Sequence, residues 1–258
     1  MSKFLRELVE KCVPGVSLDC VVLGYQNNVL KVLLLKYKEH NAWALPGGFL
    51  PQGQEMEEVI GLVLKERTGL DGVYLEQFKT YSSINRGWNC NEISQEGFNK
   101  LRSTWSTADR TVLDQWFNQR FISTAYFALI NCNKAEPTPD AVSEECAWVP
   151  VNELPNLVLD HKKMISEALS QLKRQINFLP IGKELLDQKF TMLDLQRLYE
   201  SILDQKLDRG NFQRKMMKLG ILTRHEKLMT GAQNKAPYLY SIDLKVYDQL
   251  IKTGISFV

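Results

Sequence analysis

The segment from Pro46-Gly47-Gly48-Phe49 to Thr68-Gly69-Leu70, PGGFLPQGQEMEEVIGLVLKERTGL, decides how the first half of this chain is interpreted. A Gly-Gly turn precedes a loop and then an apolar-periodic run that ends at Gly69, so we expect a loop followed by a helix. Positions 63, 66 and 67 are spaced i, i+3 and i+4 and therefore share one helix face. That face consists of Val63, Glu66 and Arg67, which place one carboxylate beside a permanent cation.

The segment resembles the box of the Nudix hydrolases, whose pattern is G-x5-E-x7-R-E-U-x-E-E-x-G-U, with U an aliphatic residue. Five positions agree with this pattern: Gly48, Leu64, Glu66, Gly69 and Leu70. Four positions depart from it, where the family has Glu, Arg, Glu and Glu: Gln54, Leu62, Val63 and Arg67. The resemblance implies an α/β fold, the Nudix-like α/β/α sandwich, with most of the catalytic side chains replaced.

The replaced positions matter because of metal chemistry. In the family, the box carboxylates hold Mg²⁺ or Mn²⁺ against a diphosphate while water attacks phosphorus, and such hard cations require oxygen ligands. Val63 and Arg67 supply none, so we expect ligand binding without cleavage, no catalytic residue, no metal and no cofactor. One alternative stays open, in which Glu55, Glu57 and Glu58 supply metal ligands from a shifted register, although acidic residues are ordinary in a first helical turn.

Composition predicts a globular protein, since 44% of the 258 residues are hydrophobic and 24% are charged. The sequence shows neither the apolar run of about 18 residues that a membrane span needs nor that of a signal peptide, so we expect a cytoplasmic protein. Five cysteines without a C-x-x-C pair predict reduced thiols. His40, His161 and His225 are scattered, and each is expected to be structural or exposed.

Periodicity predicts the elements of the first domain. Strand-like runs cover 16–25, 29–37, 73–81, 120–130 and 146–151. Gln26-Asn27-Asn28 is a plausible hairpin turn between the first two. Asp160 is expected to cap a helix whose apolar side runs from Met164 to Ile176. We therefore place a Nudix-like effector-binding domain at 1–177, with an insertion at about 87–119, and a linker at 178–190.

Residues 191–258 are expected to form a winged helix-turn-helix domain. Thr191-Met192-Leu193-Asp194 starts a helix with a pattern like a capping box. A second helix is predicted from Asp208 to Gly220, with Phe212, Met216 and Leu219 as its buried stripe. A strand at 221–223, a polar stretch at 230–235 and an alternating strand at 238–242 follow. The order helix, turn, basic helix, hairpin is that of a winged helix-turn-helix.

Charge in this domain favours nucleic acid as a partner. Between Lys206 and Lys235 there are eight basic and two acidic residues, a local charge of +6 in a chain whose total is +2. Such asymmetry suits neutralisation of phosphate. The residues predicted to contact DNA are Arg209, Asn211, Arg214, Lys215, Lys218 and Lys235. The alternative is a solvated basic helix without a partner.

The combination of a broken box and a terminal winged helix, with Leu154-Pro155, Leu159-Asp160-His161, Phe190-Thr191 and Leu195-Gln196 between, resembles the Nudix-related transcriptional regulators. These bacterial proteins include regulators of NAD metabolism and of sugar catabolism. The resemblance implies a homodimer on palindromic double-stranded operator DNA. It also implies a small-molecule effector, ADP-ribose or a sugar derivative, in the Nudix-derived pocket.

Three effector contacts are expected by resemblance to Nudix ligand sites: Phe49, Arg86 and Tyr126. Arg86 is expected either to pair with a phosphate or hydroxyls or to be a surface arginine without a partner. In and beside the insertion, Trp88, Trp105 and Trp116 either stack on a ligand ring or give the insertion a small core. The family's wing commonly has a Gly-Arg-Pro-Ala-like tip, for which Lys235 is the nearest substitute here.

Three functions remain open at this point, and the first is preferred. The chain is an effector-gated DNA-binding regulator, or a working Nudix hydrolase that uses Glu66 with displaced carboxylates on a nucleoside diphosphate derivative, or a ligand-sensing dimer whose basic domain docks on protein or RNA. Mg²⁺-dependent product release distinguishes the hydrolase. Salt-dependent, sequence-selective duplex binding distinguishes the regulator.

Overall fold

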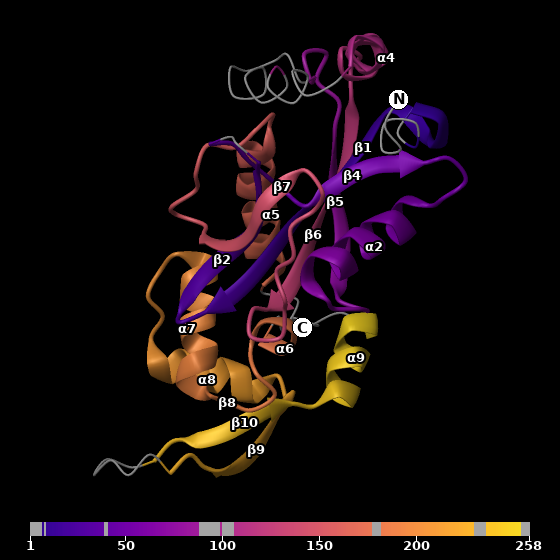
Figure 1. Cartoon of the computed structure of the whole chain (residues 1–258). Helices are drawn as coiled ribbons and strands as arrows, with labels where there is room; N and C mark the ends of the chain where they lie inside the picture. The colour runs from indigo at the N-terminus through magenta and orange to yellow at the C-terminus, as the bar shows by residue number, and fades with distance from the viewer. Residues whose placement is uncertain are drawn as a thin grey trace. The chain divides into compact units, whose positions relative to one another are not determined.

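A computed structural model describes residues 7, 9–38, 41–87, 99, 106–176, 182–229 and 236–253, which form two compact units (Figure 1). The first unit comprises residues 1–23, 31–130 and 134–168. The second comprises residues 24–30, 131–133 and 169–258. The boundary between the two units falls after residue 168, within the helix that covers residues 161–175. It therefore lies earlier than the boundary expected at 177, because the last turns of this helix belong to the second unit.

A seven-stranded sheet forms the centre of the first unit. Its strands are β1 (Cys12–Gln26), β2 (Val29–Tyr37), β3 (Trp43–Ala44), β4 (Gly47–Pro51), β5 (Tyr74–Tyr81), β6 (Ile122–Asn131) and β7 (Ser143–Pro150). The main order is β3-β2-β1-β6-β5, while β4 pairs with β1 and β7 with β2, both antiparallel. All five strand-like runs of the sequence are strands here. The short strands β3 and β4 were not predicted.

The turn between β1 and β2 has the conformation that its sequence favours. Asn27 and Asn28 have φ angles of 53° and 61°. Two successive left-handed residues define a type I′ turn, which matches the twist of a hairpin and favours asparagine. The predicted hairpin is therefore confirmed.

Helices α2 (Met56–Thr68) and α5 (His161–Gln175) pack on opposite faces of the sheet (Figure 1). Val59, Ile60 and Leu64 of α2 share a core with Leu18, Cys20 and Val22, which alternate along β1. Because successive side chains of a strand point to opposite faces, Asp19 points to the other side. It lies there beside His161, the first residue of α5. The predicted α/β/α sandwich is confirmed.

The box segment folds as expected, with a loop, a helix and a glycine stop. Gly69 has a φ of 72°, and its N–H donates to the carbonyl of Lys65 at 2.8 Å. This left-handed residue ends α2, as glycine does at many helix C-termini.

The insertion contains helix α4 (Thr107–Phe117). Trp116 and Phe117 are buried with Phe121, and the ring of Phe49 lies 6.0 Å from that of Trp116. Trp116 thus belongs to a small core of the insertion, which was one of the two roles expected for these tryptophans, the other being stacking on a ligand ring. Trp88 and Trp105 lie outside the described residues, as does His40.

In the second unit, a helix pair lies directly before a β-hairpin. The elements are α6 (Gly182–Leu185), β8 (Phe190–Thr191), α7 (Met192–Leu203), α8 (Arg209–Lys218), β9 (Leu222–Lys227), β10 (Tyr238–Ile242) and α9 (Leu244–Thr253). The strands form a sheet in the order β8-β10-β9. Helix α6 lies in the segment expected to be a linker, whose residues 178–181 are not described. Helix α9 was not predicted.

Helices α7 and α8 form the predicted helix-turn-helix. Thr191 and Asp194 make a full capping box at the start of α7. The rings of Tyr199 and Phe212 pack at 5.3 Å between the two helices. Gly220, with a φ of 68°, follows α8 as expected. None of the helices in the described part of the chain has the length and apolar character needed to cross a membrane.

Candidate functional site

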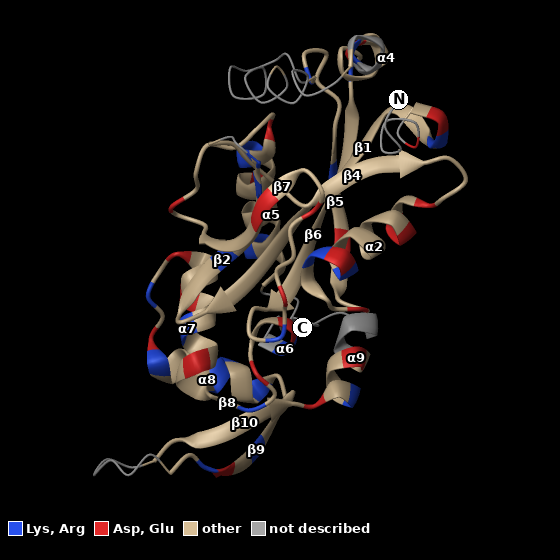
Figure 2. Ribbon diagram, viewed as in Figure 1, with Lys and Arg blue, Asp and Glu red and all other residues tan. Residues whose placement is uncertain are grey.

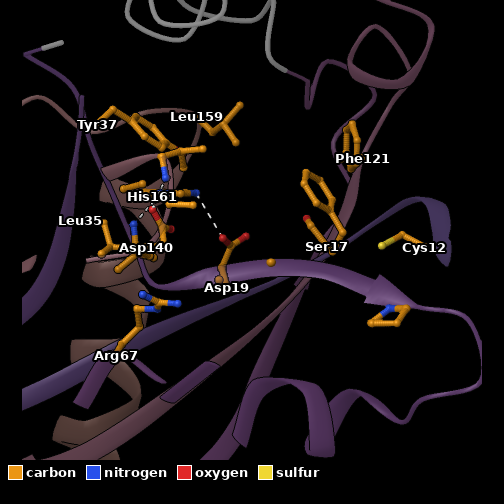
Figure 3. A pocket seen from close by; sticks show the side chains of 18 of the residues that line it. Cys12, Ser17, Asp19, Leu35, Tyr37, Arg67, Phe121, Asp140, Leu159 and His161 are labelled. Carbon is orange, nitrogen blue, oxygen red and sulfur yellow. Dashed lines mark hydrogen bonds and ion pairs between the residues drawn. The ribbon is translucent and has the colours of Figure 1, made fainter. Parts of the chain in front are cut away.

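A pocket of about 570 Å³ opens in the first unit beside β1, β2, β4 and the start of α5 (Figure 3). Its volume lies within the range of small-molecule sites. In Figure 3, Tyr37, Leu35 and Leu159 lie toward one end and Phe121 toward the other, where the ring of Phe49 lies 5.6 Å from that of Phe121. Asp19 lies between these ends in the view of Figure 3. The pocket therefore combines two apolar ends with a polar centre.

Asp19 is the centre of a buried polar network. Its Oδ2 accepts hydrogen bonds from Arg86 Nη2 at 3.1 Å and from the Ser123 hydroxyl. Arg86 also donates through Nε to both carboxylate oxygens of Asp160, at 3.0 and 3.2 Å. Two carboxylates thus neutralise one guanidinium whose side chain is 3% exposed. A buried ion pair needs such additional hydrogen bonds to offset its desolvation.

His161 faces the same carboxylate. Its Nδ1 accepts from the backbone N–H of Leu45 at 3.0 Å, so the ring proton resides on Nε2 in the neutral form. Nε2 lies 3.4 Å from Asp19 Oδ1 and has no hydrogen bond of good geometry to the described residues. Burial lowers the pKa of His161, against the opposing effect of Asp19. A neutral N–H therefore lines the pocket beside Asp19 at neutral pH.

The structure brings two of the three expected effector contacts to this pocket. Phe49 and Arg86 line it. Arg86 is not the partner-free surface arginine that was one expectation, because Asp19 and Asp160 enclose it. Tyr126 is buried in the core against α2, and its hydroxyl donates to Glu57 Oε1 at 3.2 Å. It does not line this pocket, since its side chain points to the opposite face of the sheet from Asp19.

Arg67 dominates the face of α2 where the Nudix box pattern has metal-binding carboxylates. Val63 lies behind Gly48, 3.9 Å from where a Cβ on that glycine would be. Arg67 lines the pocket, and its Nη2 lies 2.7 Å from Oε2 of the exposed Glu66. In residues 7–253, apart from the segments not described, no group of three or more His, Cys, Asp or Glu side chains is placed to hold a metal ion.

Sequence reasoning missed Asp19 as a site residue, although one feature could have indicated it. Asp19 is the single charged residue in the run 16–25, VSLDCVVLGY. A charge in an otherwise buried strand must be paired or serve a ligand. His161 was expected to be structural or exposed, and it is buried at the pocket. Its partners come from positions distant in sequence, which periodicity does not reveal.

Helix α8 presents the predicted DNA-contacting residues to solvent. Its N-cap Asp208 accepts from the N–H of Asn211 at 2.8 Å. Phe212 and Met216 are buried, whereas these five side chains are exposed: Arg209, Asn211, Arg214, Lys215 and Lys218. Lys and Arg residues gather along this helix in Figure 2. Lys235 lies outside the described residues.

Two further features shape this surface. Arg214 donates to the side-chain oxygen of Asn211, one turn earlier on α8. In the hairpin, Arg224 and Lys227 lie 4.7 and 5.3 Å from the ring centre of the exposed Tyr238, within the range of cation–π contacts. Both groupings position cationic side chains on the exterior of the second unit.

Glu200 fixes the turn between α7 and α8. Its carboxylate accepts from the N–H of Leu207 at 2.9 Å, from Gln196 Nε2 at 3.0 Å and from Lys206 Nζ at 3.2 Å. The hydrogen bond from the backbone N–H of Leu207, followed by that from the side chain of Gln196, lowers the pKa of Glu200 to about 2. The charged carboxylate therefore holds the start of α8 in place.

Comparison with known proteins agrees with this arrangement. Residues 182–242 match the family model of the NrtR DNA-binding winged helix domain. Over 245 residues the chain is 27% identical to the ADPR responsive transcriptional repressor NtrR of Acinetobacter baylyi (strain ATCC 33305 / BD413 / ADP1). The aligned residues cover 91% of this chain and 84% of the relative.

Solved structures extend the likeness to the whole fold. Shewanella oneidensis NrtR complexed with a 27mer DNA is similar with a TM-score of 0.67 and 21% identity, over 90% of this chain and 95% of that one. A MutT/nudix family protein from Enterococcus faecalis is similar with a TM-score of 0.61 and 20% identity, over 90% and 87%. The chain thus has the fold of these proteins, a Nudix-like domain followed by a winged helix domain, and its residues 182–242 match the NrtR DNA-binding winged helix model.

Proposed function

We propose that this protein is a transcriptional repressor that binds operator DNA through α8 and the β9–β10 wing and senses ADP-ribose in the pocket of its Nudix-like domain. The observation that supports it most is the exposed basic face of α8 within the segment that matches the NrtR winged helix model. The Acinetobacter relative is described as an ADPR responsive repressor, and it is similar along nearly the whole chain.

The face of α8 offers two kinds of contact. Arg214 and Asn211 are side chains that can make bidentate contacts with guanine and adenine edges in the major groove. Lys215 and Lys218 suit phosphate, which positions a protein without specifying sequence. The helix therefore combines base readout with electrostatic attraction.

The pocket suits a ligand with an aromatic ring, hydroxyl groups and phosphates. Phe49 and Phe121 offer apolar surface for a ring, Asp19 can accept hydroxyl protons, and Arg67 can bind an anion. ADP-ribose contains all three groups. A sugar or sugar phosphate is the second effector class, because it would use the polar centre without the aromatic end.

We further propose that the Nudix-like domain does not hydrolyse its ligand. Val63 and Arg67 give no oxygen to a metal, and Glu66 is exposed and paired with Arg67. Incubation with ADP-ribose and a nucleotide-sugar panel in Mg²⁺ or Mn²⁺ should therefore release no product above background. Turnover near the common enzyme value of about 1 s⁻¹ would restore the hydrolase as the function.

A homodimer in the cytoplasm completes the proposal. A two-fold symmetric protein reads a palindromic site with two recognition helices, so the half-site spacing reflects the dimer. Sedimentation velocity of the full chain, alone and with operator duplex, should show a dimer in both samples. A monomer on DNA would contradict this part of the proposal.

The test of the function starts from a random duplex library, because the operator is unknown. Purified protein should enrich one palindromic sequence, and fluorescence anisotropy should then show that duplex binding more tightly than a shuffled duplex by roughly 10³-fold or more. Affinity should fall steeply with salt, and ADP-ribose should change it. Equal affinity for both duplexes would leave the basic domain as a docking surface for protein or RNA.

A further inference from the structure

Arg67 occupies a position with two unusual properties. It stands in the last turn of α2 where the box pattern has a metal-binding glutamate, and it lines the ligand pocket. Its side chain is only 12% exposed. Nη1 donates to the carbonyl of Thr138 at 3.2 Å, and Nη2 donates to Glu66. The substitution therefore puts a fixed cation at the former metal face.

The guanidinium has donors to spare. Within the described part of the chain, two of its five N–H groups have protein acceptors, which leaves three for a ligand. Guanidinium binds phosphate oxygens directly, through parallel charge-assisted hydrogen bonds. A glutamate at this position would bind phosphate only through a divalent cation, because both groups are negative.

The other cations of the pocket are less suited to this role. Arg86 is enclosed by Asp19 and Asp160, whose two negative charges outweigh its own. Lys11 is exposed and lies 3.5 Å from Glu7. Glu66, the counter-ion of Arg67, is 65% exposed. Exposed ion pairs contribute little free energy, so a phosphate can compete with Glu66 for Arg67.

We propose that Arg67 is the phosphate-anchoring residue of the pocket and takes the place of the divalent cation, so that a diphosphate ligand binds without metal. This inference rests on the proposed function. Arg67 then lies at the end of the pocket near Leu35 and Asp140, and Phe121 lies at the other (Figure 3). A ligand with a diphosphate and an aromatic ring would span the distance between them.

The first experiment is titration calorimetry of ADP-ribose into the full-length protein, in EDTA and in Mg²⁺. The wild type should bind equally in both buffers. Arg67→Gln should weaken binding about tenfold or more, the usual effect of losing hydrogen bonds to a charged group. Lys65→Gln is the matched control, because Lys65 lies on the same helix turn but pairs with Asp71 outside the pocket. It should leave the affinity unchanged.

A second variant guards against loss of fold in Arg67→Gln. Glu66→Gln removes the exposed counter-ion and should strengthen ADP-ribose binding, an effect that a damaged fold would not produce. A Mg²⁺ requirement in the wild type, or equal affinity in all three variants, would overturn the role of Arg67 while leaving the proposed function intact. Failure of the wild type to bind ADP-ribose in either buffer would overturn both the effector and this subsite, and the duplex-binding assay would still report on DNA recognition.

Discussion

Gly47 lies so close to the neighbouring strand that no side chain fits there. It pairs with Asp19 across β4 and β1. A Cβ at this position would lie 2.4 Å from the carbonyl oxygen of Leu18 and 2.8 Å from Asp19 Oδ1. The contact partners are backbone and the central carboxylate of the pocket, so neither can move without cost. The glycine therefore permits the approach that forms the polar centre.

Gly47→Ala should lower the stability of the Nudix-like domain by about 1–3 kcal/mol, the usual cost of overpacking, and should weaken ligand binding because Asp19 shifts. The control is Gly61→Ala in the middle of α2, where a Cβ would meet nothing within 4 Å. That change should raise stability by up to about 1 kcal/mol through helix propensity. The thermal unfolding midpoints of Gly47→Ala and Gly61→Ala measure both effects. An unchanged midpoint in Gly47→Ala would contradict the close approach of the two strands.

His161 makes the stability of the same domain depend on pH. Its folded-state pKa lies below the ordinary 6.5, first because of burial, although Asp19 and Asp160 oppose and Arg86 supports the shift. The unfolded chain then binds more protons than the native state between these two values, so stability rises with pH. Urea midpoints should fall as pH drops below 6.5. The fall of the urea midpoint with decreasing pH should be smaller in His161→Gln. If the midpoint of this variant changed with pH as much as that of the wild type, groups other than His161 would be responsible.

At the scale of elements, α8 is expected to separate specificity from general affinity. Arg214→Ala should cost on the order of 1–3 kcal/mol at the operator and relax selection at one base position. Lys218→Ala should weaken operator and shuffled duplexes alike and flatten the salt dependence. Lys162→Ala, an exposed lysine on α5 outside the winged helix, is the control. Anisotropy titrations in which neither α8 variant differed from this control would exclude α8 as the recognition helix.

The elements themselves could be predicted from sequence wherever local chemistry determines them. The Asn27-Asn28 turn, the Gly69 stop and the Thr191 capping box depend on neighbouring residues, and all three were recognised. Helix α9 was missed although Asp243 caps it, accepting from the N–H of Lys245 at 3.0 Å. Strand β3 was missed because it has only two residues, and β4 because it pairs with β1, which is distant in sequence.

The site was predicted less well than the fold for the same reason. Phe49 and Arg86 were placed by resemblance to Nudix ligand sites, and both line the pocket. Tyr126 lies on the same sheet, but strand register points it into the core. The link of Asp19 to Ser123, Arg86 and His161 joins four segments. No periodicity or spacing within one segment contains that information.

At the scale of the whole molecule, four elements contribute residues to both compact units: β1, β2, β6 and α5. Strand β1 begins in the first unit and ends in the second, and so does α5. Asp19 of the pocket lies on β1, and His161 lies on α5. Rigid elements of this kind can transmit a change at one site to another, provided that they have two arrangements which both ligands bias.

ADP-ribose should therefore change operator affinity by roughly 1–3 kcal/mol, the usual range of allosteric coupling. Coupling is reciprocal, so operator DNA must change ADP-ribose affinity by the same factor. Calorimetric titration of ADP-ribose into free protein and into the protein–operator complex measures one side, and anisotropy with and without ADP-ribose measures the other. Lys218→Ala is a useful control, because it should lower DNA affinity without changing the coupling factor. Equal ADP-ribose affinity in the free and DNA-bound states would reduce the Nudix-like domain to a scaffold, since a ligand that binds both states equally shifts neither.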